Sequence, residues 1–279
     1  MLFELFSTIL ERDRRPLSSR ETAHRSHALY YLVLAEEAEP HLKGAQQLVW
    51  LKRLEQEQGN LCAVLSWLME QEEAELAVRL YAALWRFWDL RGYWSEGRRW
   101  LRAALSLSGA QGRTVARAKA LNAAGNLAHR QYDEAVAHLL LAESVTLCRE
   151  LNQDRELVGP LGKLGEVMQR QGDLAAGRSL IEECMVLCRK LGSHWDFARL
   201  LYRLAYLAWL EGDLTQKVAL LQESRVLARE VGDKDVIANA LNSLGYTAYL
   251  QGNQILAATQ AQEAITLAQE LGDIGNIGY

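Results

Sequence analysis

Residues 154–193 read DRELVGPLGKLGEVMQRQGDLAAGRSLIEECMVLCRKLGS, and this stretch contains the pattern that organises the whole chain. Apolar residues at helical spacing predict one helix over about Arg155–Arg170 and a second over about Leu174–Leu191. Gly172 and Asp173 lie between the two, where glycine permits the left-handed conformation that ends a helix and aspartate can cap the next one. The stretch therefore predicts a helical hairpin.

The same hairpin recurs at a spacing of forty residues along the chain. The turn position holds Gly92, Gly172, Gly212 and Gly252, with Tyr132 at the remaining slot. The first helices share a small residue at Gly125, Gly165, Ala205 and Gly245. The second helices share one at Gly97, Ala137, Gly177 and Ala257, and Lys217 is the exception. Because such hairpins bury their apolar faces only by stacking, we expect an all-α, right-handed α–α superhelix of five units, 76–112, 113–153, 154–193, 194–233 and 234–273.

Composition agrees with a folded protein in a reducing compartment. Hydrophobic residues make up 49% of the 279 residues, and the strong helix formers dominate nearly every window. A formal charge of −4 and a pI near 5.9 argue against direct nucleic-acid binding. We expect no membrane span and no signal peptide, and the four cysteines do not form a disulfide framework. A cytoplasmic protein fits these features best.

The spacing of small and large residues that recurs from unit to unit resembles the tetratricopeptide repeat. Leu164-Gly165, Gly172-Asp173, Gly177, Ile181 and Cys184 show the whole pattern in one unit. The forty-residue period is longer than the thirty-four usual for that repeat, which implies longer helices. Tyr132 at a turn and Lys217 at a small-residue position are departures that put the local geometry there in question.

Residues 21–75 are also helical but do not follow the repeat. We expect helices over ETAHRSHALYYLVLAEEAE (ended by Pro40), AQQLVWLKRLEQEQ and NLCAVLSWLMEQ, with Asn60 as the N-cap of the third. Together with LAVRLYAALWRFWDLRGYWSEGRRWL (residues 76–101), this segment resembles the MalT-like helical sensor region of bacterial STAND, LuxR-type and NB-ARC ATPase regulators. The resemblance covers roughly residues 3–273. It implies ATPase and DNA-binding modules in a longer parent chain, a remnant of a linker helix at 1–20, and a truncated unit or tail at 274–279.

No pattern nominates a catalytic residue, a metal ligand or a cofactor, and we predict a protein that is not an enzyme. Gly159-Pro-Leu-Gly162-Lys163 has the wrong spacing for a phosphate-binding loop and lies within a predicted helix. Cys184 and Cys188 occupy core positions of the repeat, so packing explains them better than metal binding. The tryptophans and arginines of residues 79–102 favour packing at the junction with the repeats, with partner or nucleic-acid contact as the alternatives.

A ligand should bind where the first helices line the concave face of the superhelix. The positions expected to point there are Arg79, Arg86, Asp89, Lys119, Asn122, Asn126, His129, Arg130, Glu166, Gln169, Arg170, Arg199, Tyr202, Tyr206, Trp209, Asn239, Asn242, Tyr246 and Tyr249. Their amide, guanidinium and aromatic groups suit a peptide, a protein segment or a small inducer, although a merely solvated inner wall is the alternative. The function expected is a sensor or interaction domain of a STAND-type transcriptional regulator, and the alternative is a stand-alone adaptor. The ends of the array also favour self-association.

Overall fold

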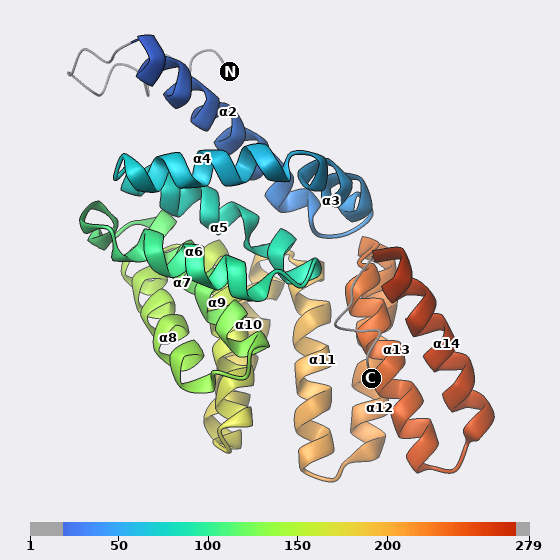
Figure 1. The fold of residues 1–279 in the computed structure, drawn as a ribbon. Helices are drawn as coiled ribbons and strands as arrows, with labels where there is room; N and C mark the ends of the chain where they lie inside the picture. Colours follow the sequence, from blue (N-terminus) through green and yellow to red (C-terminus); the bar gives the residue numbers. More distant parts are fainter. Residues whose placement is uncertain (1–18, 272–279) are drawn as a thin grey trace.

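The computed structural model describes residues 19–271, and all of their regular structure is helical (Figure 1). Three helices come first: α2 (Ser19–His41), α3 (Gln47–Gln56) and α4 (Gln58–Glu70). Hairpins follow as α5 (Ala74–Leu90) with α6 (Trp94–Ser106), a 3₁₀ turn η1 (Ser108–Gln111), α7 (Val115–Arg130) with α8 (Glu134–Glu150), α9 (Asp154–Arg170) with α10 (Leu174–Leu191), α11 (His194–Leu210) with α12 (Leu214–Val231), and α13 (Lys234–Leu250) with α14 (Gln254–Leu271). The expected α–α superhelix is confirmed. Most of the predicted linker helix at 1–20 and the tail at 274–279 lie outside the described residues.

The turns within the hairpins have the predicted chemistry. Gly172 has a φ of +92°, and Asp173 accepts a hydrogen bond from the backbone N–H of Ala176 at 3.0 Å, which caps α10. Tyr132 takes the same place in its own turn with a φ of +60°. The turn geometry is thus kept without glycine, at the cost of backbone strain that a glycine would not have.

Successive helices are held in register by one repeated buried contact. In three hairpins the second helix sends a polar or thiol side chain, seven residues after its small-residue position, to a backbone carbonyl of the first helix of the same hairpin. The pairs are Ser144 Oγ to Ala118 O (2.7 Å), Cys184 Sγ to Val158 O (3.2 Å) and Ser224 Oγ to Ala198 O (2.7 Å). Glycine also allows close approach, because a Cβ on Gly177 would lie only 2.8 Å from the carbonyl oxygen of Gly165.

The helices before the repeats differ in detail from the expected ones. Pro40 does not end its helix but lies within the last turn of α2. Asn60 is not an N-cap, since α4 begins at Gln58. The Asn60 amide donates instead to Glu57 Oε2 at 2.8 Å, and Glu57 also accepts a hydrogen bond from the Tyr31 hydroxyl at 2.6 Å. Glu57 thereby ties α2 to the junction of α3 and α4.

The apolar core extends along the array as several clusters of buried residues. One cluster joins α2–α7, a second joins α7–α11, and smaller ones lie in the last two hairpins. Trp88 is buried beside Tyr81, and Cys184 and Cys188 are buried, as the packing interpretations predict. None of the described helices combines the length and apolar character needed to cross a membrane.

Candidate functional site: the inner face of the superhelix

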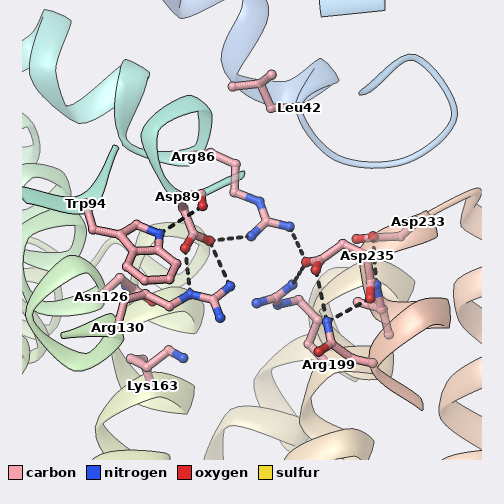
Figure 2. Close-up of polar contacts among 12 residues, drawn as sticks. Leu42, Arg86, Asp89, Trp94, Asn126, Arg130, Lys163, Arg199, Asp233 and Asp235 are labelled. Carbon is pink, nitrogen blue, oxygen red and sulfur yellow. Dashed lines mark hydrogen bonds and ion pairs between the residues drawn. The ribbon is translucent and has the colours of Figure 1, made fainter. Parts of the chain in front are cut away.

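The first helices of four hairpins, α5, α7, α11 and α13, meet across the inside of the superhelix through a layer of largely buried ion pairs. Arg86 of α5 donates from Nη2 to Asp235 Oδ2 of α13 at 2.8 Å, although the two residues are 149 positions apart. Its other terminal nitrogen donates to Asp89 Oδ2 at 2.9 Å. Arg130 of α7 binds Asp89 Oδ1 at 2.6 Å, and Arg199 of α11 binds Asp235 at 3.2 Å. Figure 2 shows this group, which we call the Arg86 layer.

Burial makes the charges of the Arg86 layer interdependent. The Arg86 and Asp235 side chains are each only 1% exposed. Burial alone would raise the pKa of Asp235, but the guanidinium groups of Arg86 and Arg199 hold that pKa well below its ordinary value. The pKa of Asp89 is lowered against its own burial by Arg130 and Arg86 in the same way. Each carboxylate therefore stays ionised because two guanidinium groups face it.

A second charged group, the Glu166 cluster, lies on the same face and consists of Glu166, His129, Lys163 and Arg203. Glu166 Oε2 binds Lys163 Nζ at 2.6 Å and Arg203 Nε at 3.1 Å, and its other oxygen lies 3.1 Å from His129 Nε2. Burial lowers the pKa of Lys163 to about 7, with Glu166 opposing the shift and Arg203 adding to it. Lys163 therefore titrates near neutral pH.

The segment before the repeats folds back onto the far end of the array. The α2–α3 turn touches the α12–α13 turn, because a Cβ on Gly44 would lie 2.6 Å from the carbonyl oxygen of Val231. Lys43 in this turn places its ammonium 4.2 Å from the ring centroid of Trp195 in α11. Figure 1 shows α3 above the upper ends of α13 and α14, and Arg91 of the α5–α6 turn binds both Glu55 of α3 and the carbonyl oxygen of Leu271 in α14. The superhelix is thus closed on one side by α2 and α3.

At least two cavities are open on the inner face formed by residues 19–271. The first has a volume of about 600 Å³ and lies between the α2–α3 turn and the N-terminal halves of α7, α9 and α11. The second, of about 400 Å³, lies among the C-terminal halves of α7 and α9 and the facing parts of α11 and α13. Arg199 and Arg203 line both cavities, so these two side chains divide the inner space.

A separate exposed surface lies at the ends of α11 and α13 and around the turns that follow them. It carries Tyr206 (36% exposed), Trp209 (38%), Tyr246 (51%) and Tyr249 (64%), together with Leu210 and Ile255. The rings of Tyr206 and Trp209 lie 5.6 Å apart between centroids. We call this surface the aromatic rim. Neither cavity includes any of its side chains.

Most of the residues predicted for the concave face do line the cavities. The first cavity includes Arg86, Lys119, Asn122, Asn126 and Arg199. The second includes His129, Arg130, Glu166, Arg170, Arg199, Tyr202, Asn239 and Asn242. Tyr206, Trp209, Tyr246 and Tyr249 form the aromatic rim instead. Asp89 is buried within the Arg86 layer.

Two predicted binding residues lie elsewhere. Arg79 binds Glu36 of α2 with Nε–Oε1 and Nη2–Oε2 distances of 2.8 and 2.9 Å, because α2 covers that part of α5. Gln169 is 2% exposed and packs inside its own hairpin, where Gly177 leaves room for its side chain. Conversely, the inner face includes four residues that the repeat pattern did not predict: Lys43, Trp195, Arg203 and Asp235. Their roles depend on the closure of the superhelix.

The inner face presents charged and amide side chains. Within residues 19–271, no group of three or more His, Cys, Asp or Glu side chains is arranged to hold a metal ion. Cys148 is a poor nucleophile candidate, since burial raises its pKa to about 11. What the cavities offer is guanidinium, ammonium and amide donors at fixed positions.

No protein-family model and no curated protein sequence matches the chain. Solved structures do resemble it. A Rap protein complexed with Competence and Sporulation Factor has a TM-score of 0.67 at 11% identity, covering 90% of this chain and 79% of its own. The APC/C hetero-tetramer Cut9-Hcn1 scores 0.55 at 14% identity, covering 94% and 42%. BtubC (BKLC) from P. vanneervenii scores 0.53 at 12% identity, covering 92% and 93%. These neighbours are TPR-like helical-repeat proteins, so the likeness shows a TPR-like fold.

Proposed function

We propose that this chain is a non-catalytic binding module that holds an extended peptide or protein segment along the inner face of its superhelix. The observation that carries the proposal is the pair of cavities, whose walls come from the first helices of all five hairpins. The TPR-like neighbours bind protein or peptide partners, and the Rap protein was solved with Competence and Sporulation Factor bound. The shared architecture supports the same class of ligand here.

The charges of the first cavity favour an acidic segment. Its lining contains the cations Lys43, Arg86, Lys119, Arg155, Arg199 and Arg203 against the carboxylates Glu39, Glu156 and Asp196. Within residues 19–271, no carboxylate oxygen lies within 4.0 Å of a nitrogen of Lys43 or Arg155. Arg155 is also exposed. These two side chains are the ones free to bind a carboxylate of the ligand.

The test is a selection of random peptides displayed on phage against the full chain, followed by calorimetry on a synthetic selected peptide. Arg155→Ala should weaken binding by roughly tenfold or more, because a charge-assisted hydrogen bond is lost. Arg113→Ala is the matched control, since Arg113 is 67% exposed and paired with Glu150 outside the cavities. If no peptide is enriched, or if both variants bind equally well, the proposal fails.

The biological setting of this binding is a finer proposal. From the resemblance to MalT-like regions, we infer that the module is the sensor arm of a STAND-type regulator, in which ligand binding biases a nucleotide-driven switch elsewhere in a longer chain. A stand-alone adaptor would use the same inner face. Sequencing the flanking DNA separates the two, because an in-frame nucleotide-binding segment upstream supports the regulator. Its absence supports the adaptor.

A further inference from the structure

The aromatic rim contains a buried cation at a position where the other hairpins have a small residue. Lys217 of α12 takes the place of Gly97, Ala137, Gly177 and Ala257 in the other second helices. It is only 6% exposed. Its ammonium lies 5.5 Å from the ring centroid of Trp209 and 5.6 Å from that of Tyr246. The charge therefore lies between two exposed aromatic side chains of the rim.

Lys217 has no anionic partner in the part of the chain that the structure describes. None of the carboxylate oxygens of residues 19–271 lies within 4.0 Å of its ammonium. Burial lowers the pKa of Lys217, and no neighbouring charge opposes that shift. Lys163, by contrast, is also buried but has Glu166 beside it. The two aromatic faces attract the ammonium, but they do not replace a counter-ion.

The rest of the rim is apolar and accessible. Tyr249 is 64% exposed and Ile255 is 84% exposed, and both flank the α13–α14 turn. In the α11–α12 hairpin these two positions hold Trp209 and Thr215, whereas the α9–α10 hairpin has Gln169 and Ala175 there, so large aromatic residues at the first position begin with Trp209. An apolar surface of this kind, with a desolvated cation inside it, is complementary to apolar side chains that carry a carboxylate between them.

We propose that the aromatic rim, with Lys217 at its centre, is a docking site for a peptide segment in which an aspartate or glutamate lies between large apolar or aromatic residues. The carboxylate would bind the Lys217 ammonium, and the flanking side chains would cover Trp209, Tyr246 and Tyr249. Because neither cavity includes these residues, this site is independent of the inner-face site.

The experiment isolates ligands that depend on Lys217. Random peptides displayed on phage are selected on the immobilised full chain in the presence of excess soluble Lys217→Gln protein, which removes peptides bound anywhere else. We expect the enriched peptides to carry an acidic residue flanked by aromatic or large apolar ones. A synthetic selected peptide should bind the Lys217→Gln protein roughly tenfold or more weakly. Lys190→Gln, which changes a lysine 68% exposed on α10, should leave binding unchanged.

A double-mutant cycle assigns the contact. Replacing the acidic residue of the peptide by its amide should weaken binding to the native chain by the same factor, and it should have no further effect on the Lys217→Gln protein. Lys217→Met keeps about the same side-chain volume without the charge, and it replaces Lys217→Gln in the cycle if the glutamine variant does not fold. Enriched peptides without an acidic residue, or an amide peptide of equal affinity, would overturn the proposal. So would a concentration-dependent dimer in sedimentation velocity that Tyr249→Glu abolishes, since a second copy would then cover the rim.

Discussion

Removing the charge of Asp235 should loosen the contact between the two ends of the array. Asp235→Asn keeps the side-chain shape but leaves Arg86, only 1% exposed, with Asp89 as its remaining anionic partner. Breaking a buried ion pair by removing one partner costs about 3–5 kcal/mol. Arg199 also loses its carboxylate partner, but it is 19% exposed and Arg86 retains Asp89, so we expect the lower end, about 3 kcal/mol of unfolding free energy. Glu263→Gln is the control, because the Arg229–Glu263 pair is about half exposed and should cost less than about 1 kcal/mol.

The assay is urea unfolding at neutral pH followed by far-ultraviolet circular dichroism, with small-angle X-ray scattering of the folded proteins to detect opening of the superhelix. The pH dependence gives a second check. Because the pKa of folded Asp235 lies below its unfolded value of about 3.9, its contribution is complete above that pH and is lost as the pH falls through the folded pKa. The native chain and the variant should therefore converge in strong acid. An effect at neutral pH no larger than that of Glu263→Gln would show that the Arg86 layer does not hold the ends together.

Three further outcomes follow from the packing and the buried charges. Lys217→Met should raise the free energy of unfolding by about 1 kcal/mol, because it removes a desolvated charge that has no counter-ion, and a thermal melt at neutral pH with a lowered midpoint would contradict this. Gly165→Ala should lower the free energy of unfolding by about 1–3 kcal/mol in urea, since its Cβ would lie 2.8 Å from Ile181 Cγ1. A Cβ at Gly59 would have nothing within 4 Å, so Gly59→Ala should be neutral or stabilising. Equal effects of the two variants would be inconsistent with the packing. Because the pKa of Lys163 is lowered, the folded chain binds fewer protons than the unfolded chain above about pH 7, so the free energy of unfolding should rise from there toward about pH 10. Lys163→Met should flatten that rise. A variant whose urea midpoint changes with pH as in the native chain would contradict the lowered pKa.

The local structure could be predicted from the sequence because it depends on residues close together in the chain. The forty-residue period, the glycine turns and the capping aspartates specify each hairpin and its stacking on the next. Tyr132 shows that a turn can keep its left-handed conformation when the glycine is missing. Apolar periodicity therefore recovered the fold class and placed most of the inner-face residues.

The closure of the superhelix could not be predicted in this way. Arg86 and Asp235 are 149 positions apart, and their contact depends on how curvature accumulates over several hairpins. The fold-back of the α2–α3 turn onto Val231 has no periodic signal either. Gln169 had the register of a concave residue, but Gly177 lets its side chain pack inside the hairpin. Lys217 was visible in the sequence as an exception, but its burial between Trp209 and Tyr246 could not be predicted from the repeat.

The most direct measurement is photo-crosslinking of a selected peptide, with a benzophenone side chain at its centre, to the full chain, mapped by mass spectrometry. For a peptide whose binding depends on Arg155, we predict crosslinks on the first helices α7, α9 and α11 and on the α2–α3 turn, which together surround the first cavity. Crosslinks confined to the second helices α8, α10 and α12 would place the ligand outside the superhelix and contradict binding along its inner face.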